Sequence, residues 1–173
     1  IPAAMSLGVV ATGAAAQSAA QTASPLTVQV YNADAASFHV NAVLVAGKTD
    51  AVLLDTGFTR ADALRIAAMV LDSRKTLKTI YISQADPDFY FGIEVLKQYF
   101  PDAKVVATAP TLKKIQATLP TKLQVWGPRL GANAPKNVPL PELLSGNTIT
   151  VEGQTLEIRG LDDNLPHRSY VWI

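Results

Sequence analysis

The decisive stretch of this sequence is YISQADPDFYFG, residues 81–92. It overlaps the end of Leu77–Ile82, an apolar run with the length and composition of a buried strand. It precedes Ile93–Phe100, whose apolar spacing predicts a helix that Pro101 ends. In α/β proteins the loop between a strand and the next helix commonly carries the binding and catalytic groups. The glutamine and the two aspartates of this loop therefore form the candidate site.

Before this stretch the chain changes from strands to a helix. Alternating apolar residues predict strands over Leu26–Tyr31, Phe38–Ala46 and Ala51–Asp55, and the last two make a hairpin. From Thr59 to Leu71 the apolar period becomes that of a helix, and Thr59 and Asp62 have the spacing of a capping box. The predicted buried face of this helix consists of Leu64, Ala67, Ala68 and Leu71.

After the polar loop, strands and helices alternate. We expect a strand at Lys104–Ala107 and a helix from about Pro110 to Leu119. Glycines and prolines then crowd Lys122–Pro141, which predicts a long irregular surface loop. The remaining predicted strands are a hairpin, Ile149–Val151 with Leu156–Arg159, and a final strand, Tyr170–Trp172.

The order β-β-α-β-α-β-α predicts one α/β domain. Helices would cover a layered sheet that starts with antiparallel hairpins and continues through crossover connections. We place this domain at residues 26–173 of the 173. The sequence reaches Ile173 in the middle of its last predicted strand, so we expect the domain to be incomplete at its C-terminus.

Residues 1–25 are predicted to be a signal-peptide remnant and a linker. An apolar segment, Met5–Gly13, precedes the small-residue run Ala14–Gln17, and no charged side chain occurs before Asp34. We therefore expect a periplasmic or secreted protein. The alternative interpretation of the same residues is a disordered alanine-rich leader.

Charge and composition argue against several classes of protein. The 15 basic and 14 acidic residues nearly cancel, so nucleic-acid binding is not expected. No uninterrupted apolar stretch has the roughly 20 residues of a membrane helix, so no stable membrane span is expected in the mature form. The lack of cysteine removes disulfides, thiolate zinc ligands and cysteine nucleophiles.

A wider pattern surrounds the polar loop. It consists of AVLLDTG at residues 51–57, an amphipathic helix, TIYIS at 79–83, and YFG at 90–92. This pattern resembles the metallo-β-lactamase superfamily over about Leu26–Ile173. The resemblance implies the N-terminal part of an αββα metallo-β-lactamase-type sandwich, which a missing C-terminal half normally completes. It also implies hydrolase ancestry.

The superfamily reads H-x-H-x-D-H at this loop, where two zinc ions share a hydroxide that attacks a carbonyl or phosphoryl centre. Aligned on that motif, this chain has Gln84 and Asp86 at the first two histidines, Asp88 at the aspartate and Phe89 at the last histidine. Asp88 alone matches, and it would be the catalytic residue if the protein is active. The loss of three imidazole ligands predicts that the dizinc site is not competent, so we expect no metal and no cofactor.

Two other interpretations of the loop stay open. The oxygen atoms of Gln84, Asp86 and Asp88 are ligands of the kind that suit Mg²⁺ or Ca²⁺, although no wider carboxylate cluster supports them. Alternatively, the two aspartates are turn carboxylates that cap the following helix and accept hydrogen bonds from loop amides.

Structural roles are expected for the remaining polar and aromatic candidates. The resemblance makes Asp55 a strand-end aspartate that organises loops, and Gly57 part of its tight turn. His39, in a predicted strand, and His167, before the final strand, have no second histidine at metal-motif spacing. Trp126 and Trp172 are expected to pack, and Trp126 is also a candidate for the rim of a cleft.

Three functional hypotheses follow. The first is an exported pseudoenzyme of metallo-β-lactamase fold that binds a small-molecule ligand or is vestigial. The second is an exported hydrolase of lactone, β-lactam or other ester-like substrates, acting through a remodelled metal centre on Asp86 and Asp88. The third is a truncated gene product with no selected activity.

Overall fold

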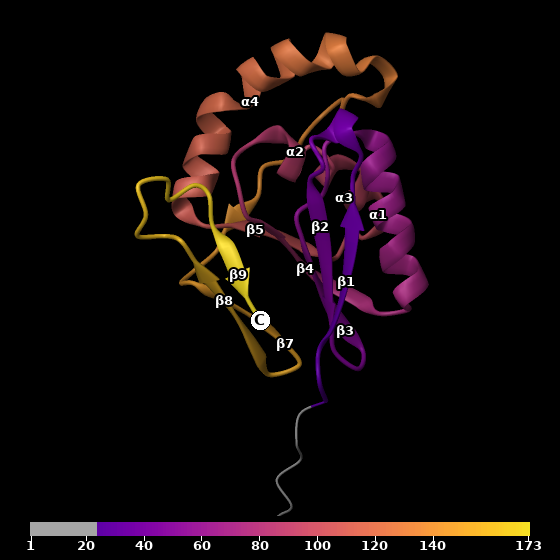
Figure 1. Ribbon diagram of the computed structural model, residues 1–173, viewed down its shortest axis with the longest axis vertical. Coiled ribbons are helices and arrows are strands. Elements are labelled where there is room, and N and C mark those ends of the chain that lie inside the picture. The colour runs from indigo at the N-terminus through magenta and orange to yellow at the C-terminus, as the bar shows by residue number, and fades with distance from the viewer. Residues whose placement is uncertain (1–23) are drawn as a thin grey trace, which may run out of the picture.

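The computed structural model describes residues 24–173, which form a six-stranded sheet, a three-stranded sheet and several helices (Figure 1). The predicted targeting segment lies outside the described residues except at its very end. Among residues 24–173, no helix combines the length and the apolar character that crossing a membrane requires.

The larger sheet has the strand order β1-β2-β3-β4-β5-β6. Neighbours from β1 to β3 pair antiparallel, whereas those from β3 to β6 pair parallel. The predicted sheet, with hairpins first and crossovers after, is therefore confirmed. Its strands are β1 (Thr27–Asn32), β2 (Asn41–Ala46), β3 (Asp50–Leu54), β4 (Thr76–Ile82), β5 (Lys104–Ala107) and the unpredicted β6 (Glu142–Leu143).

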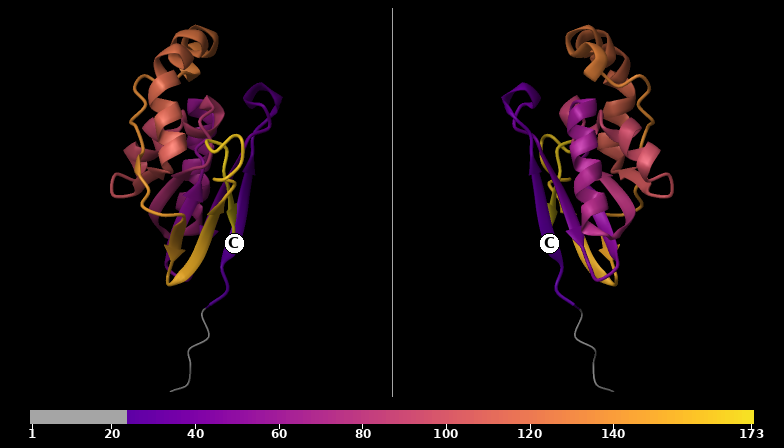
Figure 2. Two further views of the ribbon diagram at one scale, coloured as in Figure 1. Left: turned by 90° about the vertical axis from the view of Figure 1, so that its left-hand side faces the viewer. Right: turned by 90° about the vertical axis from the view of Figure 1, so that its right-hand side faces the viewer.

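Helices cover one face of this sheet, and the smaller sheet covers the other (Figure 2). The smaller sheet is antiparallel, in the order β7-β8-β9. It contains the predicted second hairpin and the predicted final strand. Its strands are β7 (Thr148–Val151), β8 (Gln154–Arg159) and β9 (Tyr170–Trp172). The helices are α1 (Arg60–Ser73), α2 (Pro87–Tyr90), α3 (Ile93–Tyr99) and α4 (Ala109–Leu130), with short 3-10 turns η1 (Ala35–Ser37) and η2 (Gly131–Asn133).

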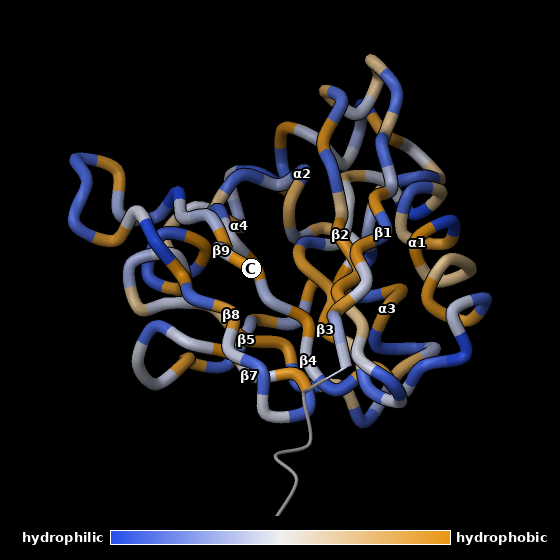
Figure 3. Tube along the Cα trace, turned by 60° about the horizontal axis from the view of Figure 1, so that its bottom comes forward, coloured by the Kyte–Doolittle hydropathy of each residue, from blue (hydrophilic) through white to orange (hydrophobic). Residues whose placement is uncertain are grey.

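The central strands are apolar on both faces, and Figure 3 shows them as strongly hydrophobic segments. Successive side chains of a strand point to opposite faces, so neighbours in sequence enter different cores. Leu53 packs among the helices, while Val52 and Leu54 pack against the smaller sheet. This two-sided burial produces the layers.

Helix α1 has the predicted cap but a different buried face. The Thr59 hydroxyl accepts a hydrogen bond from the backbone N–H of Asp62 (3.0 Å), and the Asp62 carboxylate accepts one in return from the backbone N–H of Thr59 (3.1 Å). The predicted face was wrong: Leu64 and Leu71 are 44% and 55% exposed. Since the helix is apolar nearly all round, packing decides which side is covered. The buried apolar residues are Ala63, Ile66, Ala67 and Val70.

Helix α4 corrects the predicted loop at Lys122–Pro141, because the helix continues to Leu130 through Pro120 and Pro128. Both prolines are exposed, so the carbonyls that lose a helical partner at these points face water. One apolar stripe runs the length of the helix and packs on the core, and Figure 1 shows α4 bending over the top of the molecule. The stripe consists of Leu112, Ile115, Leu119, Leu123, Trp126 and Leu130. Tertiary packing thus outweighs the local helix-breaking signal.

Candidate functional site

An open cleft of about 460 Å³ lies between the ends of the two sheets. Its walls come from the turn before β2, the ends of β3 and β4, α2, and the segment that leads into β9. The polar loop of the sequence contributes Gln84, Asp88 and Phe89 to this wall. Segments from both halves of the chain therefore meet at the predicted site.

Asp55 joins the ends of two parallel strands. It follows β3 with a φ of +65°, and its backbone N–H donates to the carbonyl of Tyr81 at the end of β4 (2.8 Å). Its carboxyl accepts the backbone N–H of Ser83 at 2.8 Å and the hydroxyl of Ser83 at 2.6 Å. Burial raises the pKa of Asp55 to about 7, although the two bonds from Ser83 act in the opposite direction. The contacts suit a residue that organises loops.

Two glycines allow the loops beside Asp55 to approach closely. Gly57 has a φ of +83°, and a Cβ there would lie 2.9 Å from the Cβ of Asp62. At Gly92 a Cβ would lie 2.0 Å from the carbonyl oxygen of Thr56. The Thr56 backbone N–H also donates to the carbonyl of Phe89 (2.9 Å), so the loop after β3 is joined directly to α2.

Asp86 is held by two basic side chains from distant parts of the chain. Its Oδ1 lies 3.2 Å from Nζ of Lys122 on α4, and its Oδ2 lies 3.1 Å from a guanidinium nitrogen of Arg168. Asp86 is the N-terminal cap position of α2, yet its side chain makes no capping hydrogen bond. The interpretation of Asp86 as a helix cap is therefore wrong. Neither Lys122 nor Arg168 was a sequence candidate.

Asp88 lies in the first turn of α2, half-buried, and lines the cleft. Among the ion pairs of residues 24–173, none includes Asp88. Burial raises the pKa of this carboxyl, and a hydrogen bond from its own backbone N–H acts in the opposite direction. The nearby charge of Asp86 raises the pKa further, while Lys122 and Arg168 lower it. Asp88 is thus the acidic side chain of the motif that keeps no cationic partner of its own.

The segment before β9 closes over the polar loop. Gln84 forms an isolated antiparallel bridge with Arg168, and the backbone N–H of Ala85 donates to the carbonyl of His167 (3.3 Å). The hydroxyl of Ser169 donates to the carbonyl of Ser83 at 2.8 Å. Sequence reasoning missed Ser169 and Arg168 because their partners lie more than 80 positions away.

The two histidines occupy different places. His39 is in a turn with a φ of +54°, so its predicted position in a strand was wrong, and it lines the cleft. His167 lies in a turn beside the first part of α4, where it lines a separate hollow with Lys113 and Lys114. The structure does not bring the histidines into one ligand set.

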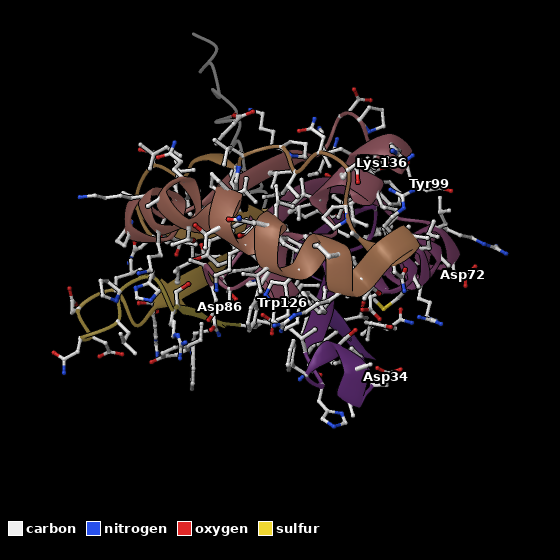
Figure 4. The ribbon with its side chains drawn as sticks, turned by 90° about the horizontal axis from the view of Figure 1, so that it is seen from above. Asp34, Asp72, Asp86, Tyr99, Trp126 and Lys136 are labelled. Atoms are coloured by element: carbon white, nitrogen blue, oxygen red, sulfur yellow. The ribbon has the colours of Figure 1, made fainter. Side chains whose placement is uncertain are left out.

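Trp126 packs and also forms a rim. Its ring meets Phe38 edge-on at 5.7 Å between centroids and Phe58 at 5.1 Å. It also lines a hollow of about 220 Å³ beside the cleft, together with Phe38, Asp86 and Asp88. Figure 4 shows the labelled side chains of Asp86 and Trp126 along the same edge of α4. Trp172, in contrast, is 58% exposed, with the guanidinium of Arg159 over its ring at 4.4 Å.

The residues at the motif do not fit zinc. Within residues 24–173, no three His, Cys, Asp or Glu side chains form a group that could hold a metal ion. Phe89 offers no donor atom, and the oxygens of Asp86 already face two cationic groups, which repel a divalent ion. The same pairing argues against an oxygen-ligated Mg²⁺ or Ca²⁺ at Gln84, Asp86 and Asp88.

The solved structures that resemble this chain include metallo-β-lactamases and a metallo-beta-lactamase family protein. BLEG-1, a B3 metallo-beta-lactamase, matches 84% of this chain with a TM-score of 0.58 at 15% identity. The chain has the metallo-β-lactamase fold. A metallo-beta-lactamase family protein from Thermus thermophilus matches 85% of it with a TM-score of 0.56 at 17% identity. A Cronobacter sakazakii metallo-beta-lactamase with a HARLDQ motif matches 76% with a TM-score of 0.57 at 20% identity.

The chain corresponds to part of each of these proteins. It spans 66% of the BLEG-1 chain, 55% of the Thermus chain and 50% of the Cronobacter chain. No protein-family model matches the sequence, and no curated protein is significantly similar to it. The α/β fold class and the resemblance proposed from the motif are therefore confirmed at the level of the fold.

Proposed function

We propose that this protein is a metallo-β-lactamase-fold pseudoenzyme, of hydrolase ancestry, that binds a small molecule in the cleft without a dizinc centre. The observation that carries the proposal is the pairing of Asp86 with both Lys122 and Arg168. In the H-x-H-x-D-H motif the same loop position carries a neutral imidazole that donates electrons to zinc. Here it carries a carboxylate whose charge two side chains of the protein already balance.

Electrostatics and packing support this proposal together. A divalent ion bound to Asp86 would lie close to the positive charges of Lys122 and Arg168, which would repel it. If the ion took the carboxylate of Asp86 away from these two side chains, their charges would be left without a partner. Phe89 replaces a ligand with an apolar ring, and its carbonyl is occupied by Thr56. The cleft itself persists, with a volume in the range of roughly 300–1,000 Å³ that is usual for small-molecule sites.

The metal content of the purified chain tests the proposal. We expect zinc near background after expression in zinc-supplemented medium, and no change in the melting temperature on adding either EDTA or zinc. Binding of roughly two equivalents of zinc, with a melting temperature that falls on chelation, would overturn it.

Hydrolysis of a lactone, β-lactam or other ester-like substrate through a remodelled centre is the second candidate function. The Cronobacter sakazakii protein supports this candidate, because it is a metallo-beta-lactamase whose motif also departs from H-x-H-x-D-H. Its motif HARLDQ shares Ala and Asp, at the second and fifth places, with Ala85 and Asp88 in this chain. Chromogenic substrates of the three classes, assayed with and without chelator, separate the candidates. Turnover that the chelator and Asp88→Asn both abolish would establish the second function.

We also propose that the protein acts outside the cytoplasm, on the strength of the signal-like segment Met5–Gln17. Fusing the chain to a reporter enzyme that is active only in the periplasm tests this. Export is supported if the parent fusion shows reporter activity that disappears when arginines replace Val9 and Val10. A parent fusion that stays in the cytoplasm and shows no reporter activity would contradict export.

A further inference from the structure

Apart from one phenol, the ionisable groups that line the cleft are two carboxyls and one imidazole, that of His39. Of the residues that line it, Asp55 and Asp88 carry carboxyls, and the lining includes no lysine or arginine. Lys122 and Arg168, which lie close to the polar loop, both pair with Asp86. Because Asp55 is buried and burial raises its pKa to about 7, Asp88 is the carboxylate that a ligand in the cleft would meet.

The carboxylate of Asp88 accepts a hydrogen bond from its own backbone N–H, but among residues 24–173 it has no ion-pair partner. It is half-buried, and burial raises its pKa. Buried and half-buried carboxylates are ordinarily paired with a cation or with several hydrogen-bond donors. Asp88 thus lacks a group that a positively charged ligand would supply.

Aromatic residues line the same cleft as Asp88. Phe38, Phe89 and Tyr170 line the same cleft, from three different segments of the chain. Phe38 is 55% exposed and has a φ of +57°, a left-handed conformation that is uncommon for a bulky residue. Trp126 packs edge-on against Phe38 and holds its ring in place. Asp88 also lines the smaller hollow beside the cleft, together with Lys122 and Trp126.

We propose that the cleft binds an organic cation, an alkylammonium or arylalkylammonium group, whose charge lies against Asp88 and whose carbon skeleton contacts Phe38, Phe89 and Tyr170. Ring faces attract cations through their quadrupole, and a carboxylate adds a directional charge-assisted hydrogen bond. The combination selects against anions and gives neutral ligands little advantage. This inference rests on the proposed small-molecule function and names the class of ligand.

Three probes of equal size test the class of ligand: benzylamine, benzyl alcohol and sodium benzoate. Each is titrated into the full ¹⁵N-labelled chain at neutral pH, and the shifts of the Ser83, Gln84 and Asp88 amides are followed. Benzylamine, which is cationic, should shift these amides in a saturable way that weakens as salt is added. Benzoate should leave them unmoved.

The matched variants are Asp88→Asn and Asp72→Asn. Asp72 is an exposed carboxylate on α1, and Figure 4 shows it well away from Asp86. Asp88→Asn should weaken benzylamine binding about tenfold, the effect of removing one close, partly screened charge pair. Asp72→Asn should bind as the parent does. Phe38→Leu, which keeps an apolar side chain but removes the ring, should weaken binding several-fold and reports on the aromatic contact independently.

Each outcome is decisive. Equal shifts from all three probes, or binding of benzylamine that Asp88→Asn leaves unchanged, would overturn the assignment of a cationic ligand while leaving the cleft as a binding site. No shift from benzylamine at millimolar concentration would also overturn it. The proposed function has a separate test: it fails if the purified chain binds zinc tightly in the measurement of metal content.

Discussion

Glu152, in the turn between β7 and β8, binds Thr49 in the turn between β2 and β3. One carboxylate oxygen accepts the backbone N–H of Thr49 at 2.5 Å and its hydroxyl at 2.6 Å. The backbone N–H groups of Lys48 and Asp50 donate to the same carboxylate at 2.8 Å each. This carboxylate connects the smaller sheet to the larger one at the end of the molecule away from the cleft.

The hydrogen bonds from Thr49, Asp50 and Lys48 lower the pKa of Glu152 to about 2 from an ordinary 4.5. Because the pKa is lower in the folded state, the bonds contribute stability above about pH 4.5 and lose that contribution as the pH falls towards 2. Glu152→Gln should therefore lower the free energy of unfolding at pH 7 more than at pH 3. Urea denaturation at both values measures this.

Glu142→Gln is the control for the Glu152 experiment, since Glu142 is an exposed carboxylate on β6. Its effect should be small and equal at the two pH values. An equal loss at both pH values in Glu152→Gln would show that the charge of the carboxylate is not what holds the turns together.

Asp55 should give the opposite pH dependence. Its pKa is about 7 against an ordinary 3.8, so ionising it in the folded state costs on the order of 4 kcal/mol. The stability that protonated Asp55 contributes to the fold is complete below about pH 4 and is lost as the pH rises through 7. Asp55→Asn, which suits a positive φ and can still accept the Ser83 N–H, should flatten the fall in stability between pH 5 and 8. Unfolding free energies measured across this interval decide the matter, and a fall as steep as in the parent would contradict the assignment.

Gly92→Ala should destabilise the fold by about 3 kcal/mol or more, because the new Cβ would overlap the carbonyl oxygen of Thr56 and push two loops apart. Gly127→Ala is the matched control. No atom outside its chain neighbours and its own helix backbone lies within 4 Å of a Cβ there. Its effect should be small, because the gain of roughly 0.5–1 kcal/mol from alanine in a helix is opposed by the restriction that Pro128 places on the residue before it. Thermal melting of both variants tests the pair, and similar melting temperatures would refute the close approach of the loops.

Pro120→Ala tests the continuity of α4. Proline inside a helix costs about 3 kcal/mol relative to alanine, although the packed stripe of α4 offsets part of that. We expect the variant to gain about 1–2 kcal/mol in the free energy of unfolding and to keep or increase its helical circular dichroism. If residues 122–130 were instead an irregular loop, the substitution would leave both quantities unchanged.

Local patterns were enough for much of the fold. The hairpin of β2 and β3, the capped start of α1 and the strand β4 each depend on neighbours in sequence, through alternation, capping or a run of buried-type residues. The motif around Asp88 was likewise recognisable, because family ligands occur at short, regular spacing. The resemblance drawn from these patterns agreed with the fold.

By itself the sequence determined most of the order of strands and helices, the burial of the strand at 77–82 and the absence of imidazoles from the polar loop. The tertiary structure alone decided which face of α1 is buried, how far α4 extends, and what Asp86 does. The reason is physical. Lys122 lies 36 positions from Asp86 and Arg168 lies 82, and an ion pair across such distances leaves no periodic trace in the chain. Only the folded layers bring those charges together.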